Sequence, residues 1–340
     1  MKIAVDAMGG DHGPAVVVEG AVVAQQEFGV SVILVGDQGA IEQGLTRLGM
    51  RGPAVEIRHA SQVVGMAESP SQALRRKRDS SLRVAAELVR DGHASAFVSA
   101  GNTGAAMAIA MFTIGVLRGV DRPAIAAVLP NLKRYMVLLD VGANVNPKPW
   151  HLFQFAVMGH VYARDILGIE RPRVGLLSVG EEEGKGNDLT REAYDELRES
   201  SLNFVGNVEG RDVYNGTCDV VVTDGFTGNV ALKISESLAD MLGGMVKEEL
   251  ARDLRSRMGA ALALPAFQRV RKRVDYTEMG GAPLLGIDGA AVISHGSSPP
   301  KAIKNAVRVA AEWAKAGLNE HIKAALDAEL TRSQREGSRE

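Results

Sequence analysis

Short apolar runs alternate with helical patterns along most of this 340-residue chain, and this alternation limits the fold more than any other feature of the sequence. Runs typical of buried strands lie at 3–5, 30–36, 94–99, 124–129, 135–140, 173–180, 219–225 and 290–294. Helical patterns follow at 14–28, 70–90, 103–117, 149–167 and 299–316. Such alternation builds a mostly parallel sheet with helices on both faces. The sequence therefore predicts an α/β fold, a three-layer α/β/α sandwich.

Polar, glycine-rich motifs follow several of the predicted strands. They begin after Val5, Val98, Leu139, Leu177 and Val222. Ligands of mostly parallel sheets bind in the crevice at the carboxyl ends of the strands. One such turn carries little information, but several converging turns indicate one large site. We therefore expect the motifs at 6–12, 99–104, 140–146, 178–187 and 223–229 to line a single cleft.

The first motif, MKIAVDAMGGDHGP, predicts a strand, a glycine turn and a helix that opens with proline. Gly9 and Gly10 allow the backbone to approach a ligand closely, and the free N–H groups of the helix start suit an anion. Asp6, Asp11 and His12 add ionisable side chains at the same place. A plain strand-to-helix turn with polar caps explains these residues equally well, so the motif alone does not decide its role.

Seven motifs occur in order between residue 1 and about 315. They are DAMGGD at 6–11, ESPSQALRRKRDSS at 68–81, SAGNTGA at 99–105, LLDVGANV at 138–145, SVGEEEGKGND at 178–188, TDGFTGNVALK at 223–233 and SHGSS at 294–298. In these motifs the chain resembles the PlsX family, the phosphate acyltransferases of bacterial phospholipid synthesis.

The resemblance implies a reaction in which long-chain acyl-acyl carrier protein and inorganic phosphate give acyl phosphate and free acyl carrier protein, which feeds phosphatidic acid synthesis. It also implies the isocitrate/isopropylmalate dehydrogenase-like fold shared with phosphotransacetylases, a homodimer, and no metal or other cofactor. The downstream glycerol-3-phosphate acyltransferase is expected as a further partner.

Composition excludes other classes of protein. The chain is 46% hydrophobic and 24% charged, as in ordinary globular proteins. Aromatic residues make up only 4% and the net charge is −2, which argues against a nucleic-acid-binding role. A single cysteine, Cys218, excludes an internal disulfide. The longest uncharged apolar stretch, 105–117, is too short to span a bilayer, and no signal peptide precedes the first strand, so we expect a cytoplasmic protein.

Familiar catalytic fingerprints are missing. No G-x-G-x-x-G follows the first strand, and GEEEGKGN at 180–187 is one residue too short for a P-loop and carries Gly186 in place of Ser or Thr. A nicotinamide dehydrogenase and a nucleotide kinase are therefore not favoured. No protein nucleophile stands out either. This absence suits an acyl transfer in which phosphate itself attacks a thioester, since that reaction needs positioning, a cation and donors for the oxyanion.

Three residues are the catalytic candidates. Lys185, between two glycines, is expected to hold phosphate or the thioester oxygen, although Glu181 to Glu183 offer it ordinary ion pairs. Asn229 is expected to donate to the same oxygen, unless it only caps a helix. His12 is the best-placed general acid for the departing thiolate, which also leaves readily without help.

A larger set is expected to bind substrate or to orient the catalytic groups. Asp6 and Asp11 are candidates for orienting Lys185 or a histidine, and His295 for binding phosphate at a helix start. The expected substrate-binding residues are Asp6, Gly9, Gly10, Asp11, Asn102, Thr103, Gly104, Asp140, Asn144, Gly186, Asn187, Asp224, Gly228 and His295.

Two basic clusters compete for a further role. Arg75, Arg76, Lys77 and Arg78 follow Pro70 in a helical pattern, and Arg271, Lys272 and Arg273 lie near the end of a long helical region. Each cluster is expected to attract phosphate or the acidic acyl carrier protein. A solvated basic face is the alternative for the cluster at 75–78, and the sequence does not decide which cluster docks the carrier protein.

The pattern changes over 226–258, where apolar residues at steps of three and four predict a long helix, which Pro265 is expected to break. We predict one α/β unit over 1–327 with a protrusion at about 230–273, followed by a polar, frayed tail at 328–340. The window 247–273 has a net charge of +5 around the uncharged stretch MGAALALPAF. Peripheral contact of this window with an anionic membrane is therefore expected.

Leu262, Leu264 and Phe267 are the expected membrane contacts. Packing of these side chains in a helical hairpin or a dimer contact, with carrier protein docked on the arginines, stays open. Two alternatives to the main function also stay open: a short-chain phosphotransacetylase that uses acyl-CoA, and a non-catalytic scaffold that binds acyl carrier protein or a membrane.

Overall fold

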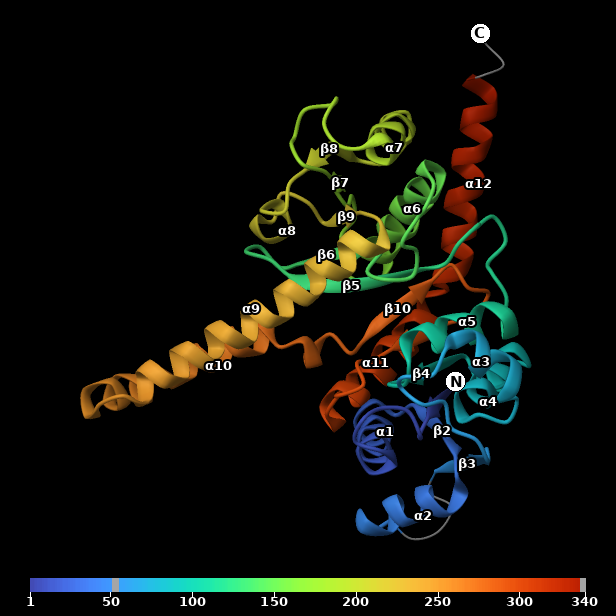
Figure 1. The fold of residues 1–340 in the computed structure, drawn as a ribbon, viewed down its shortest axis with the longest axis vertical. Helices are drawn as coiled ribbons and strands as arrows, with labels where there is room; N and C mark the ends of the chain where they lie inside the picture. Colours follow the sequence, from blue (N-terminus) through green and yellow to red (C-terminus); the bar gives the residue numbers. More distant parts are fainter. Residues whose placement is uncertain (51–54, 337–340) are drawn as a thin grey trace.

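The computed structural model describes residues 1–50 and 55–336 (Figure 1). Within them one sheet has the strand order β3-β2-β1-β4-β11-β10-β5-β6-β9-β7-β8. The strands are β1 (Lys2–Asp6), β2 (Ser31–Gly36), β3 (Glu56–His59), β4 (Ala96–Ser99), β5 (Ala124–Pro130), β6 (Tyr135–Leu139), β7 (Val174–Leu177), β8 (Phe204–Val208), β9 (Val220–Val222), β10 (Ala282–Leu285) and β11 (Ala291–Ile293). Every strand predicted from an apolar run is present.

The helices follow the predicted alternation closely. They are α1 (Pro14–Phe28), α2 (Gln38–Arg47), α3 (Pro70–Arg76), α4 (Ser81–Arg90), α5 (Thr103–Thr113), α6 (Pro149–Asp165), α7 (Asp188–Arg198), α8 (Asp212–Asn215), α9 (Gly225–Ala251), α10 (Leu254–Val274), α11 (Pro300–Ala316) and α12 (Leu318–Glu336), with a 3₁₀ turn η1 (Tyr276–Glu278). The helix predicted over 70–90 is divided, because the Ser80 side chain accepts from the Arg83 N–H and starts a new helix.

The sheet changes strand direction in its middle. β1, β2, β4 and β11 are parallel, and so are β6, β7, β8 and β9. β10 pairs antiparallel with both β11 and β5, and β5 pairs antiparallel with β6. The second parallel group therefore runs opposite to the first. The alternation of strands and helices does not reveal this reversal.

Two apolar cores lie on the two faces of the sheet, which confirms the three-layer fold. Successive residues of β1 point to opposite faces: Ile3 and Val5 join one core and Ala4 joins the other. The first core includes buried residues of α1, α6, α11 and α12, and the second includes those of α4 and α5. Aliphatic side chains dominate both cores, in line with the low aromatic content.

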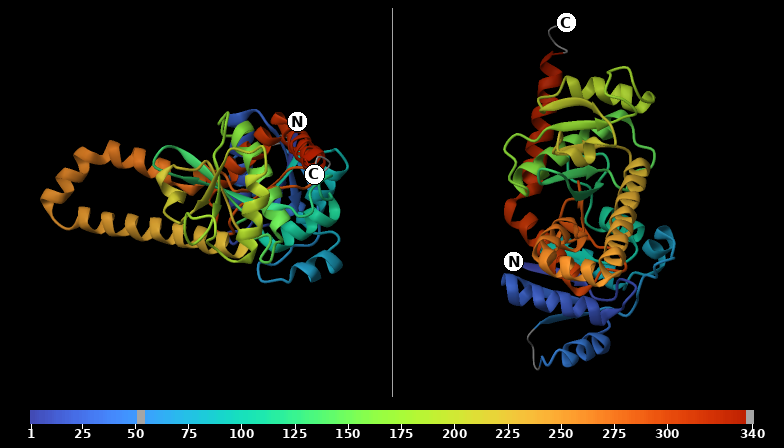
Figure 2. Two further views of the ribbon diagram at one scale, coloured as in Figure 1. Left: turned by 90° about the horizontal axis from the view of Figure 1, so that it is seen from above. Right: turned by 90° about the vertical axis from the view of Figure 1, so that its left-hand side faces the viewer.

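Helices α9 and α10 form a long hairpin that projects from the body (Figures 1 and 2). The expectation that Pro265 breaks the helix is wrong, since α10 continues through it. The chain turns instead at Arg252 and Asp253, where the Asp253 side chain accepts from the Ser256 N–H and caps α10. A single proline removes one helical hydrogen bond, and this exposed helix tolerates that loss.

The polar tail that was expected to be frayed from residue 328 is helical as far as residue 336. Helix α12 continues through 328–336, where Glu329 is buried and accepts from the Ser201 N–H. This contact fastens the end of the chain to the segment before β8. Residues 337–340 of the expected tail lie outside the described residues.

Candidate active site

Asp6 lies at the end of β1 and joins two of the predicted motifs. Its side chain is 2% exposed, and it accepts from the Ser99 hydroxyl at 2.7 Å and from the Met8 N–H. Ser99 in turn accepts from the Gly101 N–H. Burial raises the pKa of Asp6, and these hydrogen bonds oppose the rise. Asp6 therefore holds the turns after β1 and β4 together, and it does not pair with Lys185 or His12.

Gly9 is required by this close approach. A Cβ at Gly9 would lie 2.7 Å from the Gly101 nitrogen, which no real side chain tolerates. The glycine motif after β1 thus packs its backbone directly against the motif after β4. The two motifs form one continuous surface, as the sequence predicts for neighbouring strand ends.

The SHGSS motif after β11 reaches the same surface. The Asp11 N–H donates to the Gly296 carbonyl at 2.8 Å, so the loop after β1 lies beside the loop after β11. His295 is exposed and its Nδ1 is 2.7 Å from the Ser297 hydroxyl. His12 is exposed too, and its ring makes no hydrogen bond within the described part of the chain. Both rings are thus accessible to a ligand.

Asn102 has a structural task in the motif after β4. Its Oδ1 accepts from the Ala105 N–H and caps α5, while its Nδ2 donates to the carbonyls of Met66 and Glu68. Its side chain is therefore fully engaged. Thr103, at the first position of α5, is exposed, and Gly104 packs against Pro70 of α3. The cap thus ties the start of α5 to the loop that leads into the basic helix.

Asp140 organises the motif after β6 from inside the protein. Its carboxylate is fully buried and accepts from the backbone N–H groups of Ile125, Gly142, Ala143 and Asn144. The Asn144 side chain also donates to it. Burial raises the pKa of Asp140, which the hydrogen bonds oppose. Asp140 and Asn144 are both buried, and they bond to their own loop and to the chain at β5, where Asn144 donates to the Pro123 carbonyl, so they position this loop. Their expected contact with substrate stays a prediction.

This loop supports the start of α9. The Gly225 N–H donates to the Asn144 carbonyl at 2.8 Å, and a Cβ at Gly228 would lie only 1.9 Å from the Asp140 carbonyl oxygen. Asp224 caps the helix by accepting from two backbone N–H groups. Asn229 lies one turn into the helix, exposed, beside Gly142. Asp224 is therefore the cap, and the side chain of Asn229 remains available to a ligand.

Lys185 lies in the loop after β7 and is exposed. The neighbouring carboxylates do not pair with it, because Glu181 pairs with Arg211 at 2.7 Å and Glu183 pairs with Arg198. Within residues 1–50 and 55–336 the Lys185 ammonium has no ion-pair partner. The expected competition from the acidic run is thus not present, and the cation is accessible to an anionic ligand.

The residues after Lys185 shape its loop. Asn187 caps α7 by accepting from the Thr190 N–H. Gly186 adopts a φ of +108°, in the region that favours glycine. The side-chain oxygen of Asn187 therefore caps α7, as that of Asn102 caps α5.

The basic clusters divide between structural and accessible cations. Lys77 pairs with Glu68 at 2.6 Å, and Arg273 donates to the carbonyls of Asn131 and Leu132, so these two hold loops in place. The cations that are exposed and have no ion pair within the described chain are Arg75, Arg76, Arg78, Arg271 and Lys272. Each cluster keeps accessible charge.

The structure thus gathers the site residues into groups. The motifs after β1, β4 and β11 meet at one place, and the motif after β6 meets the start of α9 at another. No hydrogen bond or ion pair of the described residues joins these groups to each other or to the Lys185 loop. That all five motifs line one cleft stays a prediction. Ser99, the partner of Asp6, lies in the predicted motif 99–104 but was not named as a site residue, although its place at the end of a buried strand was a usable signal.

Comparison with known proteins identifies close relatives. The chain is 55% identical over 322 residues to "Phosphate acyltransferase" of Geotalea uraniireducens, which covers 95% of this chain and 93% of the relative. It is 53% identical over 331 residues to "Phosphate acyltransferase" of Geobacter sulfurreducens, covering 97% and 96%. The protein of the same name from Nitratidesulfovibrio vulgaris is 54% identical over 333 residues, covering 97% and 96%.

Solved structures support the fold. A phosphotransacetylase from Streptococcus pyogenes superposes with a TM-score of 0.66 at 18% identity, covering 93% of this chain and 94% of that one. The EutD phosphotransacetylase from Staphylococcus aureus gives a TM-score of 0.63 at 17% identity, covering 92% and 94%. The family model described as "Fatty acid synthesis protein" matches residues 1–321. On this match and on its close relatives, the chain belongs to the PlsX family of fatty acid synthesis proteins.

Proposed function

We propose that this chain is a phosphate acyltransferase that moves a long-chain acyl group from acyl carrier protein to inorganic phosphate and so feeds phospholipid synthesis. The observation that carries the proposal is identity above 50%, over more than 90% of both chains, to relatives named phosphate acyltransferase. The accessible ammonium of Lys185 and the accessible amide of Asn229 supply the residue types that this reaction needs.

The chemistry requires no covalent enzyme intermediate. A phosphate oxygen attacks the thioester carbonyl carbon, a C–O bond forms, and the carbonyl oxygen becomes an oxyanion. The C–S bond then breaks, the acyl phosphate leaves, and the carrier thiolate takes up a proton. Lys185 is assigned to neutralise phosphate or the oxyanion, Asn229 to donate to the oxyanion, and His12 to supply the proton.

The direct test is product trapping. Purified protein is incubated with palmitoyl-acyl carrier protein and phosphate, and hydroxylamine converts any acyl phosphate to a hydroxamate. Phosphate-dependent hydroxamate and release of free carrier protein are expected. Thioester that is bound but never consumed would instead support the non-catalytic scaffold.

A short-chain phosphotransacetylase that uses acyl-CoA is the second candidate, and two superposed structures carry the name phosphotransacetylase. At 17–18% identity the likeness shows the fold alone. Competition between palmitoyl-acyl carrier protein and acetyl-CoA in one reaction separates the two enzymes. We expect consumption of the carrier-protein thioester; preferential consumption of acetyl-CoA would reverse the assignment.

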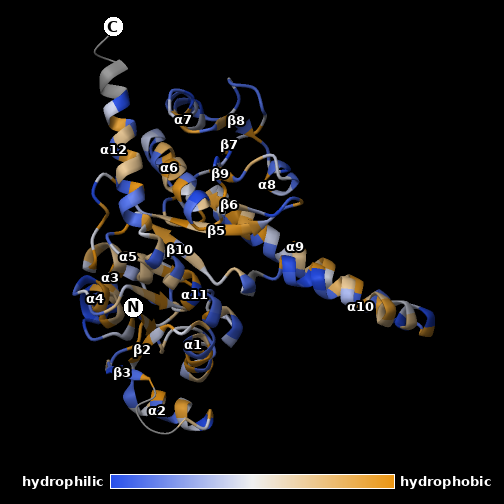
Figure 3. Ribbon diagram, turned by 180° about the vertical axis from the view of Figure 1, so that it is seen from behind, coloured by the Kyte–Doolittle hydropathy of each residue, from blue (hydrophilic) through white to orange (hydrophobic). Residues whose placement is uncertain are grey.

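The α9–α10 hairpin is the proposed site of membrane contact. Within the described residues no helix is long and apolar enough to cross a membrane. The hairpin nevertheless carries exposed apolar side chains, since Leu262 is 86% exposed and Leu264 52%. Hydrophobic and hydrophilic residues are interspersed along α9 and α10 (Figure 3). Burial of apolar tips, together with about 1 kcal/mol for each cation near an anionic surface, suffices for reversible attachment.

The same hairpin also offers surface for a second copy of the chain. Exposed apolar residues of α9 include Ile234, Leu238, Met241 and Met245. A homodimer that covers them is the proposed oligomeric state, since contiguous exposed apolar surface marks interaction sites. Docking of the acidic acyl carrier protein is assigned to the accessible cations of α3 or α10. The downstream glycerol-3-phosphate acyltransferase is the proposed receiver of the acyl phosphate.

A further inference from the structure

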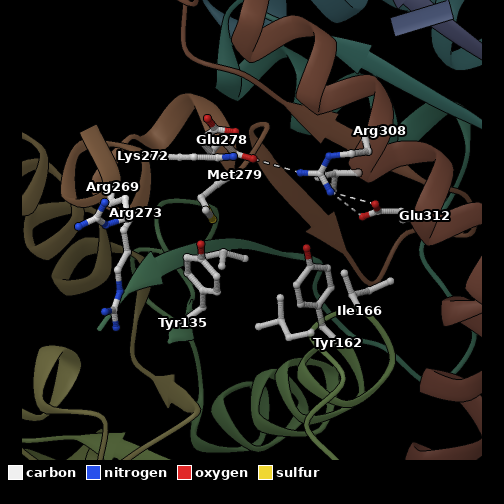
Figure 4. Close-up of a pocket in the computed structure, with 13 residues that line it drawn as sticks. Tyr135, Tyr162, Ile166, Arg269, Lys272, Arg273, Glu278, Met279, Arg308 and Glu312 are labelled. Atoms are coloured by element: carbon white, nitrogen blue, oxygen red, sulfur yellow. Dashed lines mark hydrogen bonds and ion pairs between the residues drawn. The ribbon is translucent and has the colours of Figure 1, made fainter. Parts of the chain in front are cut away.

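A pocket of about 470 Å³ lies away from all the glycine motifs. It opens between the end of α10, the η1 turn, α6, α11 and the β5–β6 pair (Figure 4). Its lining residues are Val128, Tyr135, Tyr162, Ile166, Leu167, Arg269, Lys272, Arg273, Glu278, Met279, Arg308, Val309 and Glu312. None of these residues belongs to the proposed catalytic groups.

The lining of this pocket has cations without an ion pair, whereas both of its carboxylates are paired. Arg269 and Lys272 are exposed and have no ion pair within residues 1–50 and 55–336. Arg273 donates to the backbone carbonyls of Asn131 and Leu132, and among the described residues no carboxylate pairs with it. The positive charge at this wall therefore favours an anionic ligand.

The two carboxylates of the lining are already paired. Glu312 accepts from Arg308 at 2.9 Å, and Glu278 pairs with Lys301 at 2.7 Å. Arg308 also donates to the Glu278 carbonyl at 3.1 Å, which joins α11 to the η1 turn. Their negative charge is thus compensated inside the protein. The cations of α10 remain for a ligand.

Two tyrosine hydroxyls point into the pocket from the opposite side (Figure 4). Tyr162 is only 2% exposed, yet its hydroxyl makes no hydrogen bond to any residue the structure describes. Burial raises the pKa of the Tyr162 phenol, so it stays protonated and able to donate. The hydroxyl oxygen is not itself among the fully buried polar atoms, so it is accessible from the pocket and able to donate to a ligand, and Tyr135 adds a second hydroxyl to the same side of the lining.

The remaining lining is apolar. Ile166 and Leu167 follow α6, Val309 lies on α11, Val128 on β5, and Met279 follows the η1 turn. The pocket volume of about 470 Å³ lies within the range of about 300–1,000 Å³ that is common for small-molecule sites. Inorganic phosphate alone would leave most of that space as water against apolar walls. The ligand must therefore add an apolar part to its charge.

We infer that this pocket binds a single-chain amphipathic anion, with its phosphate or carboxylate head at Arg269 and Lys272 and its chain against Ile166, Leu167 and Val309. The Tyr162 hydroxyl donates to the head group. Acyl phosphates and fatty acids both have this chemistry. The site is separate from the proposed catalytic groups, and its occupancy is testable without an activity assay.

The test uses dodecyl phosphate, dodecanoate and inorganic phosphate as probes, each titrated calorimetrically into the full-length protein below the micelle concentration. Dodecyl phosphate or dodecanoate is expected to bind. Comparison of their two affinities shows whether the site prefers a phosphate or a carboxylate head group. The double variant Arg269→Gln with Lys272→Gln is expected to weaken this binding about tenfold or more, and Tyr162→Phe about fivefold. Arg255→Gln is the matched control, since it removes one cation from α10 outside the pocket.

A dodecyl phosphate analogue with a photoreactive chain locates the bound molecule independently. Labelling of the peptide that contains 162–167 is expected, and it should disappear in the double variant. Labels confined to 6–12 or 223–229 would place the ligand at the proposed catalytic groups and overturn the inference. Three other results would also overturn the inference. They are an affinity for inorganic phosphate equal to that for the dodecyl probes, a loss of affinity in Arg255→Gln equal to that in the double variant, and no binding by the wild-type protein, as when a second copy covers the pocket.

Discussion

The Ser99 hydroxyl donates to the buried carboxylate of Asp6 at 2.7 Å, which joins two strand ends that lie 93 residues apart in the sequence. Ser99→Ala removes one of the donors that oppose the effect of burial on Asp6. We expect a loss of about 1–3 kcal/mol in the free energy of unfolding, because a buried acceptor loses its partner. Urea denaturation measures this loss.

Ser71→Ala is the control for that experiment, because Ser71 is exposed and its hydroxyl bonds, among the described residues, to the exposed Ser69. It should change the free energy of unfolding by less than about 0.5 kcal/mol. Equal stability of Ser99→Ala and Ser71→Ala would show that the buried contact does not hold the two turns.

Lys185→Ala is expected to lower acyl phosphate formation by about a hundredfold or more, since a cation next to the reacting groups is lost. The fold should be unchanged, because the Lys185 ammonium makes no ion pair in the described chain. Hydroxamate formation and circular dichroism measure the two properties. Lys315→Ala, on an exposed lysine at the end of α11, should keep full activity. Near-normal turnover of Lys185→Ala would remove this lysine from the site.

Asn229 and Asp224 separate a ligand-binding role from a capping role on one helix. Asn229→Ala should slow the reaction with little change in stability, because its exposed side chain caps nothing. Asp224→Ala should lower the free energy of unfolding by about 0.5–2 kcal/mol through loss of the cap. Steady-state kinetics and thermal melts of both variants test the distinction. A stability loss in Asn229→Ala without a kinetic effect would contradict it.

Acid should weaken one identifiable ion pair. Burial alone would raise the pKa of Asp219. Two hydrogen bonds from the Arg173 guanidinium and one from the Arg173 backbone N–H outweigh burial, so the pKa of Asp219 is lowered overall. A lowered pKa adds stability above the ordinary value of 3.8, and this is lost as pH falls through the folded-state pKa.

Asp219→Asn should therefore cost about 2 kcal/mol near pH 7 and progressively less below pH 4. Denaturant unfolding of both proteins across this range measures the difference. A cost that does not shrink in acid would mean that packing, and not ionisation, explains it.

Leu262→Glu combined with Leu264→Glu should abolish co-sedimentation with anionic vesicles while activity on soluble substrate is retained. The control is Leu132→Glu, which adds a charge at a residue that is 78% exposed and outside the hairpin. Continued vesicle binding by the double variant would exclude insertion of these residues. Loss of the fold or of a dimer would instead support the packing alternative.

The sequence predicted the layers well because buried strands and covering helices leave strong periodic signals, as in 30–36 and 14–28. It missed β3, β8 and β10, whose apolar runs are interrupted: β3 is largely polar, β8 contains Gly206 and Asn207, and β10 contains Pro283. It also misplaced the end of the long helix. Helix α10 continues through Pro265, and the helices are divided at Asp253, whose capping role the apolar periodicity does not show.

The predicted roles of the site residues stay predictions, but the structure shows what several of their side chains bond to. Asp140 and Asn102 were expected to touch substrate because polar residues at strand ends usually mark sites. In the structure the Asp140 side chain accepts from a backbone N–H, and the Asn102 side chain accepts from a backbone N–H and donates to a carbonyl. Burial and partner geometry depend on chain segments far apart in sequence, which a single motif does not report. Ser99 and the pocket around Tyr162 show the same limit.

The position of β10 and β11 matters for a chain still leaving the ribosome. These late strands fill the gap between β4 and β5, so the first nine strands present two unpaired inner edges until residues 282–293 emerge. Open edges of this kind invite pairing with other chains. A product truncated before residue 282 should therefore aggregate, and the nascent protein depends on its last sixth to close the sheet.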